Sequence, residues 1–242
     1  MLMALRDDYQ ALAATDPELV DYVDRFVAEE VLPHGGLDDR TRLIVQLAAL
    51  IAGQAHSAYR VLLGTALSSG VTPVEVREIV YQAVPYIGLG KALDAVTITN
   101  EVFVERGVEL PLPAQSTTTP EDRVARGRYV QGEVVGHAGV DAMYANAPAD
   151  LAHVQVYLSG NCFGDHLTRT GLDLPTRELI TFSFLVSQGG CDSQVKGHVR
   201  GNLNVGNDRA RLIDVVTQLL PYIGYPRSLN AINAINEIIP PA

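Results

Sequence analysis

The sequence predicts an all-α protein made of two tandem helical units related by a pseudo-twofold duplication. Apolar residues recur at spacings of three and four over windows longer than ordinary strands, which is typical of amphipathic helices. In addition, residues 83–95 (AVPYIGLGKALDA) return as residues 219–231 (LLPYIGYPRSLNA) at an offset of about 136 residues. A fixed offset of this kind indicates an internal duplication, so we expect two fused units that share a core.

The helical windows follow one another in the same order in both units. They cover Thr41–Ile51, Val74–Val84, Leu93–Val104, Glu178–Val186 and Arg211–Leu220. Thr72 before Pro73 predicts a capped helix start, and Gly206-Asn207-Asp208 marks the equivalent break in the second unit. Each following helix reaches Pro-Tyr-Ile-Gly, where we expect the proline to stop the helix and the glycine to permit a tight turn.

The chain is expected to divide into three segments. Residues 1–106 form the N-terminal unit, residues 107–120, rich in proline, threonine and serine, form a linker, and residues 121–242 form the C-terminal unit. Alignment of the units places Ala55 opposite Cys191 and Leu62 opposite His198. We therefore expect the first unit to be a degenerate scaffold and the second to carry the chemistry.

Composition and charge exclude several classes of protein. The 242 residues are 47% hydrophobic and carry a net charge of −10, which indicates a globular chain without the basic cluster that nucleic-acid binding requires. No segment approaches the ~20 apolar residues of a membrane span, and the acidic start Met1–Asp8 is unlike a signal peptide. We expect no nucleic-acid or membrane partner and a cytoplasmic location.

Cysteine and histidine spacings argue against a metal centre. Cys162 and Cys191 are too few for a disulfide scaffold and form no Cys-x-x-Cys pair, so we expect reduced thiols. None of the histidine, cysteine and aspartate spacings in the second half makes a recognised zinc or iron ligand set. The sequence therefore predicts no metal site.

Three motifs of the second unit resemble the carboxymuconolactone decarboxylase family, which includes alkylhydroperoxidase-like proteins. They are Thr176–Ile180 (TRELI), Gly189–Leu203 (GGCDSQVKGHVRGNL) and Pro221–Ala231 (PYIGYPRSLNA). The resemblance implies helical units that form rings and, for a duplicated chain, a homotrimer with pseudo-sixfold character. It also implies one of two chemistries: cofactor-free decarboxylation of small lactone acids, or thiol peroxidation by a Cys-x-x-Cys pair with a glutamate and a histidine.

The residues of this unit favour the decarboxylase branch. Cys191, His198 and Glu178 match the first cysteine, the histidine and the glutamate of the peroxidase pattern, but Gln194 stands where the second cysteine belongs. Without that resolving thiol the usual disulfide turnover fails, so a thiol peroxidase is disfavoured. A glutamine and a histidine one turn apart resemble the decarboxylase branch, whose chemistry needs an oxyanion-stabilising donor and a general acid.

The predicted catalytic residues are His198 for proton transfer, Gln194 as a hydrogen-bond donor to the carboxylate or enolate, Glu178 to orient the imidazole, and Cys191. Residues expected to contact the substrate are Arg177, Arg200, His166 and Tyr222. The predicted function is a cofactor-free lyase on a small or polyketide-like carboxylic or lactone substrate.

Other interpretations stay open at this point. The same groups suit an isomerase, a dehydratase or a cyclase that works through an enolate, and a non-catalytic ligand-binding or assembly protein is a further alternative. Individual residues also have structural explanations. Glu178 would satisfy first-turn amides or pair with Arg177, and Cys191 would simply be a small buried side chain.

Overall fold

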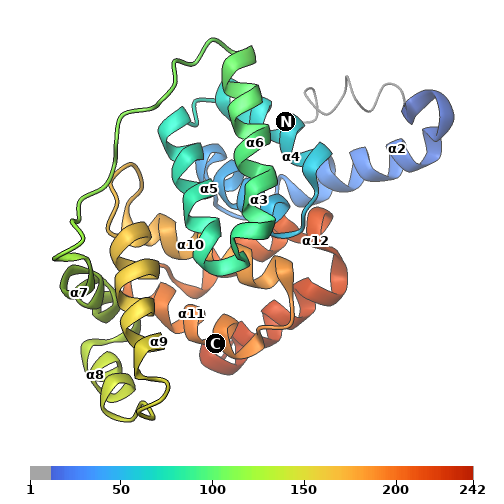
Figure 1. The fold of residues 1–242 in the computed structure, drawn as a ribbon. Coiled ribbons are helices and arrows are strands. Elements are labelled where there is room, and N and C mark those ends of the chain that lie inside the picture. The colour runs from blue at the N-terminus through green and yellow to red at the C-terminus, as the bar shows by residue number, and fades with distance from the viewer. Residues whose placement is uncertain (1–11, 242) are drawn as a thin grey trace.

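The computed structural model describes residues 12–241, and this range folds into helices joined by loops, with no strand among them (Figure 1). The interpretation of the segment Met1–Asp8 lies outside the described residues. The helices before residue 106 are α2 (Pro17–Arg25), the π-helical segment η1 (Phe26–Val31), α3 (Asp39–Ala52), α4 (His56–Ser68), α5 (Pro73–Ile87) and α6 (Leu89–Glu105). Those after it are α7 (Arg123–Val135), α8 (His137–Ala145), α9 (Ala152–Tyr157), the π-helical segment η2 (Leu158–Leu167), α10 (Leu174–Gln188), α11 (Asp192–Asn204) and α12 (Arg209–Ile238). The predicted all-α class is confirmed.

Local signals in the sequence set the helix starts. Thr72 caps α5 in a reciprocal capping box, in which its side chain accepts from the Glu75 amide while the Glu75 carboxylate accepts from the Thr72 amide. Asp208 caps α12 by accepting from the Arg211 amide. All five predicted windows fall inside helices of the structure.

The prediction that proline stops the helix at Pro-Tyr-Ile-Gly is wrong. Pro85 lies inside α5, which continues to Ile87, and Pro221 lies inside α12. The chain turns instead at Gly88 and Gly224, whose φ angles of 85° and 75° lie in the left-handed region that side chains disfavour. Each proline lacks the N–H group of one intrahelical hydrogen bond, but the helix continues past it for two residues, to Ile87 and Ile223.

The duplication is visible in the backbone of both units. Helices α4 and α11 each contain 13 residues and begin 136 positions apart, at His56 and Asp192. The π-helical segments also correspond, because the Leu32 amide donates to the Val27 carbonyl as the Thr168 amide donates to the Phe163 carbonyl. The two units therefore repeat even in an uncommon backbone feature.

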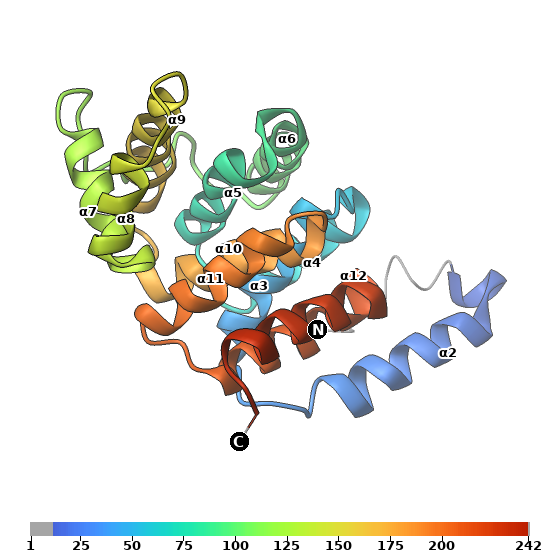
Figure 2. The same cartoon turned by 90° about the horizontal axis from the view of Figure 1, so that it is seen from below.

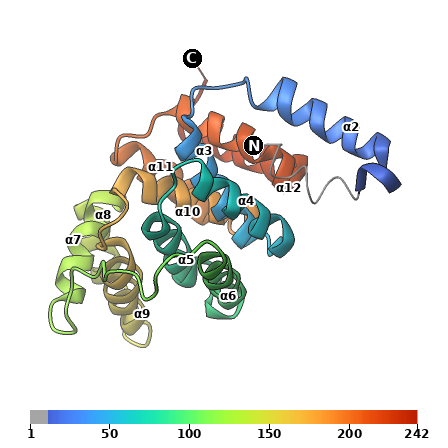
Figure 3. The ribbon, with the colours of Figure 1, turned by 90° about the horizontal axis from the view of Figure 1, so that it is seen from above.

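The two units share a core through their equivalent central helices. Helix α3 packs against α10, while α5 of the first unit contacts α10 and α12 of the second unit contacts α3 (Figures 2 and 3). As a result, Ile180 and Phe184 of α10 are buried in the core of the first unit, and Val45 and Ala49 of α3 in that of the second. This reciprocal packing means that each unit walls part of the other.

Helix α7 holds η2 in place by close backbone contact. A side chain at Gly127 would collide with the backbone of Ser159 and Gly164, so only glycine allows this approach. The buried Ser159 hydroxyl also donates to Gln131 of α7 at 2.6 Å. These contacts position η2, which carries Cys162 and His166, within the second unit, where it also contacts α5 of the first unit.

The segment between α6 and α7, residues 106–122, contains no helix and runs along the side of the molecule (Figure 1). Thr117 and Thr118 tether its end to η2 by donating from their hydroxyl groups to the carbonyls of Thr168 and Gly164. The unit and linker boundaries stay a prediction. Within residues 12–241, none of the helices combines the length and the apolar character that a membrane span requires.

Candidate active site

A histidine and a glutamate form a buried pair between α10 and α11. The Nδ1 atom of His198 lies 2.8 Å from Oε2 of Glu178, whose side chain is fully buried, while the His198 side chain keeps 18% of its surface exposed. Gly201 permits this approach, because a Cβ atom there would stand 2.9 Å from Oε2 of Glu178. The pair therefore joins a buried carboxylate to a partly accessible imidazole.

Asparagine side chains fix α11 on α10 around this pair. The Asn202 amide donates to the carbonyls of Glu178 and His198, at 3.2 Å and 2.7 Å. Asn207 donates in turn to the side-chain oxygen of Asn202 at 2.9 Å. Because these bonds are buried, they hold the backbone on both sides of the pair in one arrangement.

The second oxygen of Glu178 is buried without a hydrogen-bond partner in the described part of the chain. A buried carboxylate normally satisfies both oxygens, and leaving one unsatisfied costs about 1–3 kcal/mol. His198 is the one hydrogen-bonding partner of this carboxylate among residues 12–241. The interaction between the two side chains is consequently important for the burial of the glutamate.

Tyr86 from α5 of the first unit covers one side of the imidazole. Its ring meets that of His198 edge to face, with the centroids 5.8 Å apart. Burial, reinforced by Cys162 and Glu178 nearby, raises the pKa of the Tyr86 phenol well above its ordinary value. The phenol is thus a neutral group that excludes water from this side of the ring.

The Cys162 thiol of η2 lies next to the Tyr86 hydroxyl. Burial raises the pKa of the Cys162 thiol to about 12, although the nearby Tyr86 hydroxyl lowers it in part. A thiol with so high a pKa stays protonated at neutral pH and is a poor nucleophile. Cys162 therefore contributes packing to the site.

The orientation of the pair determines which imidazole nitrogen is free to react. An ionised carboxylate only accepts hydrogen bonds, so Glu178 accepts a hydrogen bond from Nδ1–H of His198. The Nε2 atom makes no hydrogen bond within residues 12–241 and is not sealed from solvent. Nε2 can therefore accept a proton when the ring is neutral and donate one when the ring is charged.

Gln194 and Cys191 lie at the start of α11, whereas His198 lies in the middle of this helix. Gln194, one turn before His198, is exposed, and its side-chain oxygen accepts from Ser193. Cys191 is the residue before α11, and its half-buried thiol donates to the Leu185 carbonyl at 3.2 Å. Burial raises the pKa of this thiol, which disfavours the reactive thiolate.

The predicted role of Arg177 in substrate binding needs correction. Its guanidinium is 1% exposed and pairs with Glu78 of α5 at 2.9 Å, and the same nitrogen donates to the carbonyls of Arg169 and Thr170. These bonds hold the guanidinium group of Arg177 inside the protein. Arg177 therefore joins the two units and is not accessible to a ligand. Arg200, the other predicted cation, is exposed on α11 two residues after His198, and residues two apart do not share a helix face.

The two remaining predicted substrate-binding residues are His166 and Tyr222. His166 of η2 is surrounded by Asp165, Arg169 and Glu78, and burial lowers the pKa of its imidazole. Tyr222 packs against the core of the first unit. Tyr86, its counterpart in the repeat, packs against the same core and also lies beside His198. The role of Tyr222 in substrate binding stays a prediction, and the repeated Pro-Tyr-Ile-Gly motif is the signal that also marks Tyr86.

Comparison with known proteins finds one family in both units. The model of the carboxymuconolactone decarboxylase family matches residues 17–101 and again residues 152–237. A 4-carboxymuconolactone decarboxylase from Acinetobacter baylyi is 31% identical over 118 residues, which cover 49% of this chain and 87% of that protein. The matched ranges include α3 to α5 of the first unit and their counterparts α10 to α12 of the second.

Proposed function

The chain belongs to the carboxymuconolactone decarboxylase family, and from this premise we propose that it is a cofactor-free, decarboxylase-like lyase acting on a small carboxylic or lactone acid. The observation that carries the proposal is the 2.8 Å contact between Nδ1 of His198 and the buried Glu178 carboxylate. It leaves Nε2 as an oriented acid and base at the surface of the second unit. The substrate of the Acinetobacter relative, 4-carboxymuconolactone, is the first compound to test.

In the proposed reaction, His198 protonates the substrate carbon from which the carboxylate departs. Cleavage of the carbon–carboxylate bond sends its electron pair into a conjugated carbonyl of the substrate, which becomes an enolate as carbon dioxide leaves. Nε2–H of the charged imidazole then protonates the carbon, and the neutral ring regains a proton from solvent. Glu178 stabilises the charged ring and holds its orientation throughout, as a carboxylate does for a catalytic histidine.

Gln194 and Tyr86 have proposed roles on opposite sides of the imidazole. Gln194 lies one helical turn before His198 and is free to donate its amide N–H groups to the developing enolate. Tyr86 shields the ring from water on the opposite side, which strengthens the electrostatic interactions of the pair.

The experiment measures carbon dioxide release and product mass with 4-carboxymuconolactone for the wild type and two variants. His198→Ala is expected to lower kcat by about 10²- to 10⁴-fold, the usual contribution of general acid catalysis. Gln194→Ala is expected to lower it by about tenfold, for the loss of one hydrogen bond to a charged oxygen. Leu203→Ala, an exposed position on the same helix, is the matched control and should retain the activity of the wild type.

The outcomes separate the alternatives. Full turnover by both His198→Ala and Gln194→Ala would show that the chemistry occurs elsewhere. A product of unchanged mass would indicate an isomerase or a cyclase, and a product lighter by one water a dehydratase. Tight binding without any product would favour a ligand-binding protein.

The peroxidase alternative has less physical support. The Cys191 thiol donates its proton to a carbonyl and has a raised pKa, and the pKa of the Cys162 thiol is raised to about 12. Both features oppose the thiolate that attacks a hydroperoxide. Hydroperoxide consumption by the wild type that disappears in Cys191→Ser would restore this alternative.

We also propose that the protein is a cytoplasmic homotrimer. Helix α2 extends from the body of the molecule and buries none of its residues (Figures 2 and 3). Its Leu19 and Tyr22 are 55% and 57% exposed, and apolar side chains at such exposure favour contact with another chain. Light scattering should give three times the mass of one chain, and Leu19→Glu should reduce that mass.

A further inference from the structure

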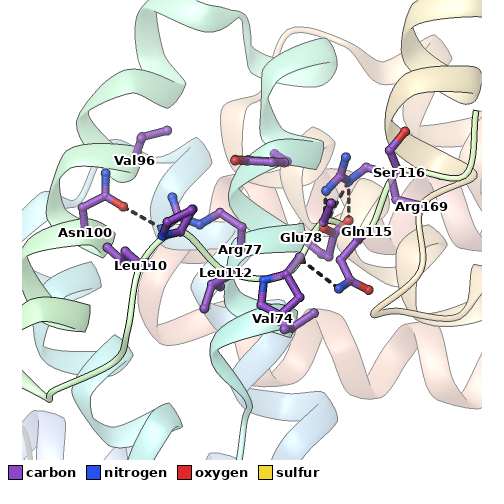
Figure 4. Close-up of a pocket in the computed structure, with 14 residues that line it drawn as sticks. Val74, Arg77, Glu78, Val96, Asn100, Leu110, Leu112, Gln115, Ser116 and Arg169 are labelled. Carbon is purple, nitrogen blue, oxygen red and sulfur yellow. Dashed lines mark hydrogen bonds and ion pairs between the residues drawn. The ribbon is translucent and has the colours of Figure 1, made fainter. Parts of the chain in front are cut away.

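A cavity lies on the side of the first unit and does not include the Glu178–His198 pair. It has a volume of about 630 Å³ and is enclosed by α5, α6, the segment between α6 and α7, and Arg169 after η2 (Figure 4). This volume is within the range of small-molecule sites, roughly 300–1,000 Å³. Neither His198 nor Tyr86 lines it, so it is separate from the candidate active site.

The cavity holds an arginine whose charge is not balanced by a carboxylate. Arg77 makes one hydrogen bond within residues 12–241, from Nη2 to the neutral side-chain oxygen of Asn100 at 2.6 Å, as Figure 4 shows. No carboxylate of the described residues lies within ion-pair distance of it. The half-buried guanidinium rests between the rings of Tyr81 and Phe103, with its carbon 5.7 Å and 5.3 Å from their centroids.

The other charged groups of the cavity are already paired. Glu78 is fully buried and receives two arginines, Arg169 at 2.9 Å and Arg177 at 2.9 Å. One carboxylate against two guanidinium groups leaves an excess of positive charge, to which Arg77 adds. The surroundings of the cavity are therefore cationic in a chain whose net charge is −10.

The other walls of the cavity are mostly apolar, and they come from helices α5 and α6 on one side and from the segment between α6 and α7 on the other. Val74 of α5 and Val96 of α6 face the segment that carries Leu110 and Leu112. This segment is fixed, because Thr170 donates to the carbonyl and the side chain of Gln115 and Thr117 donates to Thr168. The walls can thus bury an apolar body while one end meets Arg77.

We propose that this cavity binds a small monocarboxylate with an apolar body, whose carboxylate pairs with Arg77 beside Asn100. An arginine fork matches the two oxygens of a carboxylate, and a pair formed in a partly desolvated cavity is stronger than one at an open surface. Arg77 is the group to which the ligand carboxylate pairs, because its hydrogen-bond partner among the described residues is the neutral Asn100. The proposal concerns a site outside the active site and does not depend on the reaction at His198.

The test uses 2-naphthoate as the probe and 2-naphthamide as its neutral counterpart, with dissociation constants measured by calorimetry on the full chain. Wild type should bind naphthoate at least tenfold more tightly than naphthamide. Arg77→Met keeps the apolar stem but removes the charge, and should weaken naphthoate binding about tenfold while leaving naphthamide unchanged. Arg25→Met, on the exposed α2, and His198→Ala are controls that should bind as the wild type does.

Asn100→Asp provides a second variant that does not depend on removing the arginine. The substituted carboxylate has nearly the same shape as the amide and pairs with Arg77 from within the protein. It should therefore abolish the preference for naphthoate without disturbing the fold. The proposal would be overturned if the wild type bound neither probe at millimolar concentration, if both cavity variants bound naphthoate normally, or if His198→Ala removed the binding.

Discussion

Helices α4 and α11 have the same length and the same place in the two units, but they bury different side chains. Leu62 of α4 is fully buried in the apolar core of the first unit, whereas its counterpart in α11 is His198, which meets Glu178. Ala66 is likewise buried where the second unit has Asn202. The first unit shows that this arrangement of helices is stable without any polar group at these positions.

Helix α10, which packs against α11, differs from its counterpart α3 in the same way. Counted from the capping aspartates Asp38 and Asp173, Leu43 of α3 takes the place of Glu178 in α10. A buried ion pair commonly contributes less to stability than apolar residues of similar volume, because both groups lose their hydration. The fold therefore has no need of the Glu178–His198 pair, and this difference between the units is the strongest structural argument that the pair has a function.

The largest expected effect comes from giving the second unit the side chains of the first. His198→Leu alone should lower the free energy of unfolding by about 3 kcal/mol, because it leaves Glu178 buried without its partner. The double variant Glu178→Leu with His198→Leu should recover most of that loss, while both variants lose the proposed activity. Urea unfolding and carbon dioxide release measure the two effects.

A double variant less stable than His198→Leu would contradict the conclusion that the fold has no need of the Glu178–His198 pair. In that case the leucine pair of the first unit would not be an adequate substitute for the polar pair, and a structural role for Glu178 and His198 would explain the data.

A smaller effect is expected at Gly201, whose counterpart in the first unit is Thr65. Gly201→Ala places a Cβ atom 2.9 Å from both Oε2 of Glu178 and Cγ1 of Val134, so it should cost about 1–3 kcal/mol and disturb the pair. Gly197→Ala on the same helix is the matched control, since nothing lies within 4 Å of its Cβ position. The control should stabilise the protein by up to about 1 kcal/mol through its higher helix propensity. Equal stability changes in the two variants would contradict the close approach of α11 to Glu178.

The helices were predictable from the sequence because their signals are local. Apolar spacing located α3, α5, α6, α10 and α12, and Thr72-Pro73 marked the start of α5. The end of α5 was assigned to Pro85, but the helix continues through the proline to Ile87 and the chain turns at Gly88. The positive φ of Gly88 was the better signal.

The site was predictable only where its members lie close in sequence. Glu178 and His198 come from adjacent helices of one motif, and the structure brings them together. Arg177 was assigned to the substrate because its partner Glu78 stands 99 residues away and carries no motif. Tyr86 was missed because the reciprocal packing of the units, which brings α5 of the first unit against α10 of the second, is a property of the whole fold.

The repeated tyrosines allow a test of this reciprocal packing. Tyr86→Phe removes a buried hydroxyl near Cys162, Thr181 and Glu178, and should lower kcat by several-fold, up to about tenfold. Tyr222→Phe removes the equivalent hydroxyl from the core of the first unit and should leave kcat unchanged. Steady-state kinetics with the substrate identified for the wild type compare the two. A larger decrease of kcat in Tyr222→Phe than in Tyr86→Phe would mean that the active site lies in the first unit.

The smallest expected difference concerns the capping aspartates, where the two units are alike. Asp38 accepts from the Thr41 amide and Asp173 from the Thr176 amide, both at 2.9 Å. Asp38→Ala and Asp173→Ala should each cost about 1 kcal/mol at pH 7, the usual value of a helix cap. Partial burial raises the pKa of each carboxyl, but the threonine hydrogen bonds and nearby arginines outweigh it and hold the pKa below its ordinary value of 3.8.

Because each pKa is lower in the folded protein, the capping stability is present above pH ~4 and is lost as the pH falls through the folded pKa. Urea unfolding at pH 7 and pH 3 should therefore show that each variant approaches the wild type at the lower pH, and by a similar amount. A loss confined to Asp173→Ala would mean that the units differ in how their central helices begin. Equal losses would limit the difference between the units to the side chains that surround His198.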